Sequence, residues 1–551
     1  MRKLLALTVL ALIMSLVAVG SGPTAAATTH WVNDTDPNGG GYSPPGTSCT
    51  DPGYATLQSA INAASAGDTI RVCDGTYAFI GLVSVNKSVT LLGAQAGVDA
   101  CAARGAESVL SNSQGMSVSA SDVVIDGFTV ENSVVAAFTG YGIWLNPGVS
   151  GTQIVNNIIQ DNIVGVGLAN AGSSQALIQH NLLQNNNSPG GASGSGIYTD
   201  QFVGGQVTNV LIDDNCFINN DNAGVGFSST DILNPTSDIE ISNNSFDQNG
   251  RGIYFYNTNN ATVHDNSITN STVPTDGGTS VAIAAFGDVN GLTILNNDLL
   301  TGALRGIRVG SFLVNPNSNV EAHLNNIVGF ALAGLFVDPG GHAGTLNADC
   351  NWWGSPTGPT HPNNPGGTGD DVIDAPTFDV ADYTPWLTAA APGGPCIGGI
   401  PNTPGKVTGG GQIEDPVFSP LGDLISLPAI MASTSGGAQA NFGFVIQFAS
   451  GDPAPKGNLV YNDKGAGVRI KATSYDTLII GNGICGANTH ATFTGTANVN
   501  GTPKSMTVEV DDCGEPGSTT PGGPDTFSIT TDNYSNSGPL ISGNIQIHKT
   551  P

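Results

Sequence analysis

Asparagine recurs in one register through the middle of this 551-residue chain. The positions are Asn157, Asn181, Asn215, Asn244, Asn266, Asn297 and Asn325. Most of them stand in the pattern apolar-x-x-Asn-x-apolar, and successive positions are 22 to 34 residues apart. A repeat of this length, made of short apolar stretches around a polar turn, is typical of a solenoid in which each coil stacks on the next. The repeat therefore constrains the fold more than any other feature.

A second apolar stretch follows the asparagines, and it opens with glycine. The openings are Gly142-Ile143, Gly196-Ile197, Gly224-Val225, Gly252-Ile253, Gly306-Ile307 and Gly334-Leu335. Two short strands cannot bury an apolar face alone, but stacked coils can. Since the spacing of a leucine-rich repeat is missing, the pattern predicts an all-β, right-handed parallel β-helix. We interpret the asparagines as an internal ladder of stacked amides rather than a sugar-binding strip, and asparagine also tolerates left-handed turns.

The rest of the chain divides into segments of different character. Residues 1–27 are predicted to be a signal peptide, because two basic residues precede an apolar run and three alanines. Residues 28–110 are expected to form an N-terminal cap with a short helix and the first coils, and residues 111–355 the repeats. Residues 356–404 are rich in proline and glycine, which indicates a closing segment and linker. Residues 405–551 alternate in polarity and predict a small antiparallel β-sandwich.

Charge and cysteine content limit the partners and the compartment. The formal net charge of -28 excludes nucleic acid as a partner, because few basic groups are present to neutralise phosphates. No run after the signal segment is long enough to span a membrane. The eight cysteines of an exported chain permit disulfides. Proximity along the chain predicts the pairs Cys49–Cys73, Cys350–Cys396 and Cys485–Cys513, and leaves Cys101 and Cys216 over, with Cys216 expected as a free, buried thiol.

Several motifs carry a resemblance to known proteins. The repeats resemble the right-handed parallel β-helix, or pectin-lyase-like, superfamily, and the stretch from Ala55 to Tyr77 resembles the usual entry into that fold. The stretch from Asn351 to Pro359 resembles the motif that often follows such repeats in exported bacterial proteins. Segments from Lys406 to Lys549 resemble a C-terminal β module of bacterial secreted proteins. The superfamily includes lyases, hydrolases, esterases and adhesins, so the resemblance implies the fold and no single reaction.

Strand alternation predicts a candidate ligand-binding face. If the apolar residue after each opening glycine points inward, the next residue points outward. Those outward residues are Trp144, Tyr198, Tyr254, Arg308 and Phe336, with Gly167, Gly226 and Ala284 in the coils between them. We call this line of residues the aromatic column. Exposed aromatic rings on a rigid sheet can stack on sugars, and a cover by loops or by the C-terminal module is the alternative.

Carboxylates supply the candidate catalytic and metal residues. A glycosidase needs two carboxylates at a defined separation, and the repeats offer Asp213 and Asp214, with Asp200 one coil earlier. Turn formation is the alternative role for Asp214. In the C-terminal segment, Glu509, Asp511, Asp512 and Glu515 lie within seven residues near Cys513. Asp511, Asp512 and Glu515 are candidate calcium ligands, because hard cations prefer several oxygens, and a solvated acidic turn held by a disulfide is the alternative.

These observations lead to two hypotheses about function. The first is a secreted β-helix protein that binds or processes extracellular polysaccharide or another glycan, as a polysaccharide lyase or glycoside hydrolase if it is an enzyme. The second is a non-catalytic cell-surface, adhesion or structural protein. Only Arg251, Arg305 and Arg308 supply positive charge between residues 111 and 345, which is little for gripping an acidic polymer.

Overall fold

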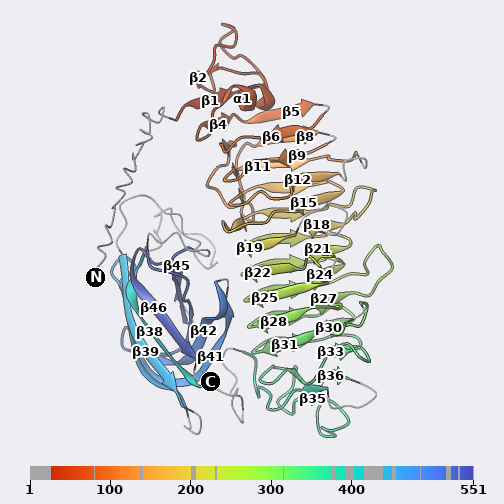
Figure 1. Cartoon of the computed structure of the whole chain (residues 1–551), viewed down its shortest axis with the longest axis vertical. Helices are drawn as coiled ribbons and strands as arrows, with labels where there is room; N and C mark the ends of the chain where they lie inside the picture. Colours follow the sequence, from red (N-terminus) through yellow and green to blue (C-terminus); the bar gives the residue numbers. More distant parts are fainter. Residues whose placement is uncertain are drawn as a thin grey trace, which may run out of the picture.

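The protein consists of a long parallel β-helix with a separate antiparallel β sheet beside it (Figure 1). A computed structural model describes residues 27–549, apart from residues 80, 113, 136–139, 200–205, 230–232, 314, 375–379, 392–395, 397–402, 415–438, 450–453, 484, 517–522 and 532–533. The predicted signal peptide thus lies outside the described residues, except for Ala27. Across the described ranges, no helix is both long and apolar enough to cross a membrane.

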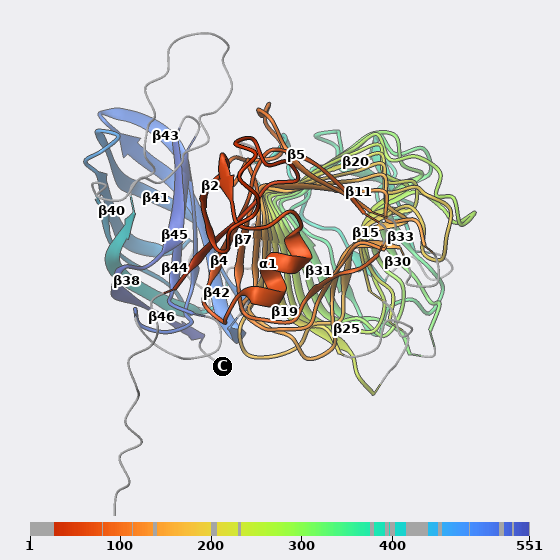
Figure 2. The same ribbon diagram turned by 90° about the horizontal axis from the view of Figure 1, so that it is seen from above.

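A short cap covers the N-terminal end of the β-helix. Helix α1 (Leu57–Ala63) begins after Thr56, whose side chain accepts a hydrogen bond from the backbone N–H of Ser59. Leu57, Ala60 and Ile61 of this helix are buried in the core of the first coils, so α1 closes the end of the apolar interior (Figure 2). The hairpin β2 (Gly46–Ser48) and β3 (Asp51–Pro52) lies next to it. This is the cap that an open solenoid end requires.

Three parallel sheets form the walls of the β-helix. The first sheet contains β1 (Thr29–Val32), β4 (Thr69–Val72), β7 (Thr90–Leu92), β10 (Val124–Asp126), β13 (Gln153–Val155), β16 (Ala176–Gln179), β19 (Thr208–Asp213), β22 (Thr236–Ser242), β25 (Thr258–His264), β28 (Asn290–Leu295), β31 (Ser318–His323), β34 (Leu346–Asn347) and β37 (Ala381–Asp382). The second contains β5 (Gly75–Phe79), β8 (Ser108–Asn112), β11 (Phe128–Glu131), β14 (Ile158–Gln160), β17 (Leu182–Gln184), β20 (Cys216–Ile218), β23 (Ser245–Asp247), β26 (Ser267–Thr269), β29 (Asp298–Leu300) and β32 (Asn326–Val328). The third contains β6 (Val83–Val85), β9 (Met116–Val118), β12 (Tyr141–Leu145), β15 (Val164–Leu168), β18 (Ser195–Thr199), β21 (Ala223–Phe227), β24 (Arg251–Phe255), β27 (Val281–Ala285), β30 (Arg305–Val309), β33 (Ala333–Val337), β35 (Pro359–Thr360) and β36 (Gly369–Ile373).

The asparagine ladder predicted from the sequence is confirmed. Each ladder asparagine donates its backbone N–H and its side-chain amide to the Oδ1 atom of the asparagine one coil further on, as Asn215 does to Asn244 at 2.9 Å in both bonds. The ladder extends one rung beyond the prediction, to Asn351. Because the side-chain amides also donate to backbone carbonyls, the buried turn is stabilised by a continuous network.

Two details of the ladder differ from the expectation. The left-handed backbone falls on the residue before each ladder asparagine, such as Asp265 with φ of 55° and Leu324 with φ of 57°, rather than on the asparagine itself. A second ladder, which the repeat analysis missed, joins buried asparagines on the far side of the second sheet. Its rungs are Asn162, Asn186, Asn220 and Asn249.

The C-terminal module is one antiparallel sheet that curls over its own core. Its strands are β38 (Gly405–Glu414), β39 (Gln439–Phe448), β40 (Lys456–Asp463), β41 (Val468–Gly483), β42 (Gly486–Val499), β43 (Thr502–Asp511), β44 (Thr526–Thr531), β45 (Tyr534–Pro539) and β46 (Ser542–Lys549). Phe442 of β39 stacks on Phe527 of β44 with ring centroids 3.8 Å apart, so the two halves of the sheet face each other. The all-β prediction is confirmed, and the two layers of the expected sandwich belong to one continuous sheet.

Four disulfides crosslink the chain. Cys49–Cys73, Cys350–Cys396 and Cys485–Cys513 are the pairs expected from proximity in the sequence. The expectation of a free Cys216 is wrong, because Cys216 pairs with Cys101 across 115 positions. Stacking explains this bridge, since the N–H of Ala100 donates to the carbonyl of His180 and the loop before β8 therefore lies against coils far along the chain.

Candidate functional site

The aromatic column has the register that the sequence predicts. Strand pairing aligns Trp144 with Gly167, Tyr198 with Gly226 and Tyr254 with Ala284, and continues to Arg308 and Phe336. The column lies on the outer side of the third sheet, because its rings belong to small clusters separate from the main core of the β-helix. Counting from the glycine openings thus located one line of neighbouring side chains.

The expectation that this column forms an open face is wrong at its centre. Tyr198 is only 8% exposed and Tyr254 only 5%. Tyr254 packs beside Tyr256 and Phe286, and its ring lies over Gly226 of the preceding coil, where a Cβ atom would come within about 2.5 Å of it. The Tyr254 ring thus lies along the sheet over Gly226 instead of standing out toward a ligand.

The ends of the column are half-buried and engaged in local contacts. The Arg308 guanidinium donates to both carboxylate oxygens of Asp338, at 2.9 and 3.2 Å, and to Thr279. It also lies 4.8 Å from the ring of Phe312, which is exposed. Trp144 is tilted against Tyr141 with ring centroids 5.9 Å apart. Only short stretches of the column therefore reach the surface.

The candidate catalytic carboxylates point to different neighbours. Asp213 accepts hydrogen bonds from Gln179, Ser242 and Asn243, at 2.7 to 2.8 Å. Asp214 has the left-handed φ of 50° and pairs with His180 at 3.1 Å, so it is a turn residue with a salt bridge. Asp200 lies outside the described residues. The two described carboxylates therefore do not act on one point, although Asp213 lines the cavity described next.

A cavity of about 690 Å³ separates the first sheet of the β-helix from the C-terminal module. Figure 2 shows strands β42 to β45 of the module lying alongside that sheet. Six carboxylate residues and two histidines from both sides line it, and no lysine or arginine is among the described lining residues. The carboxylates are Asp213, Glu240, Asp265, Asp298, Glu509 and Asp511, and the histidines are His264 and His490. The cavity is therefore an acidic space shared by two domains.

His264 stands at the end of β25, where the strand meets the left-handed turn before ladder residue Asn266. Its Nδ1 atom lies 2.7 Å from Asp265 Oδ2, and its Nε2 atom 3.1 Å from Glu240 Oε1. Burial alone would lower the pKa of this imidazole, but the hydrogen bonds with the two carboxylates outweigh it and raise the pKa well above its usual value. One proton-bearing ring thus joins two carboxylates.

A second histidine faces this group from the module. His490 Nδ1 lies 2.9 Å from Asp511 Oδ1, and Asp511 Oδ2 accepts a hydrogen bond from Thr526. The ring centroids of His490 and His264 are 6.2 Å apart. Burial opposes the charged form of both partners, yet their attraction raises the pKa of His490 and lowers that of Asp511.

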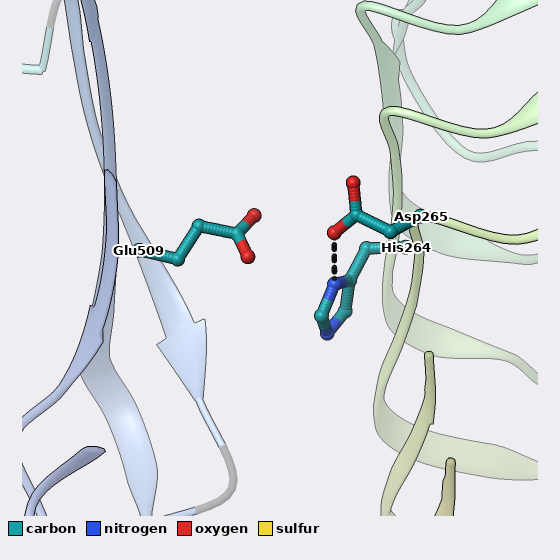
Figure 3. A group of neighbouring side chains, drawn as sticks. All are labelled: His264, Asp265 and Glu509. Carbon is teal, nitrogen blue, oxygen red and sulfur yellow. Dashed lines mark hydrogen bonds and ion pairs between the residues drawn. The ribbon is translucent and has the colours of Figure 1, made fainter. Parts of the chain in front are cut away.

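Among the described carboxylates that line the cavity, only Glu509 has a buried oxygen without a hydrogen-bond partner. Its Oε1 atom is buried and, among the described residues, accepts no hydrogen bond. The side chain extends from β43 across the interface toward His264 and Asp265 (Figure 3), and one ligand atom from each of the three residues lies within 4.8 Å of the others. Burial, and next the nearby Asp265, raise the pKa of Glu509 to about 7.

The predicted metal ligands of the module do not converge. Asp511 is turned to His490 and Thr526, whereas Asp512 accepts a hydrogen bond from the N–H of Ile547, and Glu515 is exposed. Asp511 is the last residue of β43, and Asp512 follows the strand and bonds to β46, which separates the two carboxylates. Glu509, two residues before Asp511 and on the same face of β43, approaches the β-helix instead. Sequence reasoning missed His264 and Asp265 because they occupy ordinary turn positions of the repeat.

Comparison with known proteins agrees with this architecture. The family model described as right handed beta helix region matches residues 98–250 and 232–352. The matched stretch lies within the three parallel sheets, so this part of the chain is a right-handed parallel β-helix, as its motifs indicated. No curated protein matches the chain.

Solved structures with similar folds share little sequence with the chain. An alginate lyase from Paenibacillus sp. str. FPU-7 is 18% identical, with a TM-score of 0.39, over 53% of this chain and 96% of that one. The pectate lyase Pel9A is 15% identical, with a TM-score of 0.36, over 66% and 82%. The tailspike protein gp49 from Acinetobacter baumannii bacteriophage Fri1, a capsular polysaccharide depolymerase, is 9% identical, with a TM-score of 0.29, over 76% and 78%.

Proposed function

We propose that this protein is secreted and binds carbohydrate in the cavity between the β-helix and the C-terminal module. The observation that supports this function best is the cavity itself, whose volume of about 690 Å³ falls within the usual range for ligand sites. Ligand sites occur preferentially at domain interfaces. Four disulfides and the predicted signal peptide support a location outside the cell.

The lining of the cavity favours a neutral or amine-bearing glycan. Carboxylates, amides and hydroxyls can accept and donate the hydrogen bonds of sugar hydroxyl groups, and Leu211 and Pro539 add apolar surface. An acidic polymer would meet six carboxylates and, among the described lining residues, no lysine or arginine to hold its own carboxylates. Elimination on a uronate polymer is therefore disfavoured at this site.

Binding assays with filled and unfilled cavities test the proposal. Ser528 of β44 lines the cavity, so Ser528→Trp should block it and abolish binding to the neutral or amino-sugar polysaccharide that the parent protein retains. Ser474 is an exposed serine of β41 outside the cavity, and Ser474→Trp is the matched control that should bind as the parent does. Equal binding by both variants would place any glycan elsewhere.

The same panel separates a binding protein from an enzyme. New reducing ends after incubation with the parent protein, and none with Ser528→Trp, would indicate hydrolysis in the cavity. Retention without any product would support a binding function. If the parent protein neither retains nor cleaves any polysaccharide of a broad panel, the carbohydrate function is refuted and the structural alternative takes its place.

A further inference from the structure

We propose that His264, Asp265 and Glu509 bind a divalent first-row transition metal ion, such as Zn²⁺, that joins the β-helix to the C-terminal module. His264 and Asp265 come from the turn after β25, and Glu509 from β43 of the module (Figure 3). One potential ligand atom from each residue lies within 4.8 Å of the other two. Among the described residues, no other group of three histidine, cysteine, aspartate or glutamate side chains comes together in this way.

Uncompensated negative charge is the first argument for a cation. Six carboxylate residues line the cavity, against two histidines that can supply at most two positive charges. The only described cationic groups in its wall are these imidazoles, and each already pairs with a carboxylate. Negative charges gathered in one cavity raise the local concentration of cations, so this excess favours a bound cation.

The unpartnered oxygen of Glu509 is an independent second argument. A buried acceptor without a hydrogen bond costs about 1 to 3 kcal/mol, and more for a charged group. The other carboxylates of the two paired groups have partners, since Glu240 and Asp265 bond to His264 and Asp511 bonds to His490 and Thr526. An ion held between Glu509 and the opposite turn would supply the partner that Oε1 lacks.

The mixed ligand set identifies the class of ion. Imidazole together with carboxylates suits zinc and its first-row neighbours, whereas calcium and magnesium prefer oxygen ligands alone. Ligand atoms around tetrahedral zinc are about 3.3 Å apart, given bonds of about 2.0 Å. The present separations of up to 4.8 Å would close by rotation of the Glu509 side chain. The ion would replace the proton that now joins His264 to a carboxylate, and Glu240 would remain as a neighbour able to orient the imidazole.

Metal titration of the whole secreted chain, without an affinity tag and after treatment with a chelator, tests the site directly. We expect one tight site for Zn²⁺ by calorimetry, and visible absorption bands when Co²⁺ is bound in its place. Glu509→Gln keeps the shape of the side chain but removes its charge, and should weaken Zn²⁺ binding by on the order of 10-fold or more, as should His264→Gln. This test needs no glycan, so a failure to bind Zn²⁺ leaves the carbohydrate proposal unaffected. A failure to bind carbohydrate likewise leaves the metal proposal unaffected.

Controls make each outcome decisive. Asp298 lines the same cavity outside the three proposed ligands, and Asp298→Asn should bind Zn²⁺ as the parent does. Equal affinity of the parent and Glu509→Gln, or binding of Ca²⁺ without any Co²⁺ spectrum, would overturn the proposal. If the variants fail to fold, anomalous diffraction from a zinc-soaked crystal of the parent decides the question, because a peak between β25 and β43 supports the site and its absence refutes it.

Discussion

Two neighbouring regions of this molecule use buried polar side chains in opposite ways. In the asparagine ladder, Asn266 donates to Asn297, Ile241 and His264 and accepts from Asn244, so its amide is fully bonded. One and two residues earlier in the chain, Asp265 and His264 turn outward to the interdomain cavity. There Glu509 leaves a buried oxygen unpaired. Complete hydrogen bonding is typical of a structural role, whereas an unmet bond in a cavity points to a ligand.

Removal of a ladder amide should have the largest effect on stability. Asn266→Ala leaves the backbone N–H and side-chain amide of Asn244 without their shared acceptor, and two carbonyls without a donor. We expect a loss of about 4 kcal/mol in the free energy of unfolding. The control Asn259→Ala changes a half-buried asparagine of β25, the strand that precedes Asn266, and should cost less than about 1 kcal/mol. Urea denaturation of both variants measures the difference, and similar losses would contradict a structural ladder.

Truncation in the aromatic column should cost stability and leave ligand binding unchanged. Tyr254 is buried against Phe286 and covers Gly226, so Tyr254→Ala leaves a void outside the third sheet. The expected loss is about 3 kcal/mol, near the lower end for large aromatic residues. Thermal unfolding and polysaccharide retention should be measured on the same sample. If a folded Tyr254→Ala protein no longer retained the polysaccharide, the aromatic column would be the binding face after all.

Neutralising Glu509 should have a small effect of opposite sign. In the protein without metal, Glu509→Gln removes one negative charge from a cavity lined by six carboxylates, which reduces their mutual repulsion. We therefore expect a gain in the free energy of unfolding of about 0 to 1 kcal/mol. The control Asp511→Asn breaks the bond with His490 and should cost about 1 kcal/mol. Denaturation in the presence of a chelator checks both. A clear loss in the free energy of unfolding of Glu509→Gln would show that the Glu509 carboxylate already has a bonding partner. The contrast with the asparagine ladder would then disappear.

The features that repeat from coil to coil could be predicted from the sequence. The features that depend on contacts between distant segments could not. The ladder and the register of the column follow from fixed spacing, because stacked coils place equivalent residues side by side. The cover over Tyr198 and Tyr254 comes from the neighbouring side chains of their apolar clusters, whose packing the spacing does not encode. The Cys101–Cys216 bridge and the approach of Glu509 to His264 join segments 115 and 245 positions apart, so no local pattern records them.

The smallest predicted effect concerns His180, the position equivalent to Asp265 three coils earlier. Its bonds with Asp214 outweigh burial and raise its pKa above the usual value, so the pair stabilises the fold fully below about pH 6.5 and loses this contribution as pH rises through the raised pKa. His180→Asn keeps the left-handed turn, since Asn156 occupies the equivalent position of the preceding coil with the same φ of 55°. Because both partners are partly exposed, we expect the variant to be a few tenths of a kcal/mol less stable than the parent at pH 6, and equal to it at pH 9.

Denaturation at the two pH values measures this difference in stability, with Asp214→Asn as the matching variant. A stability difference that grows toward pH 9 would contradict the pairing and would make the turn, rather than the charge, the reason for a histidine here.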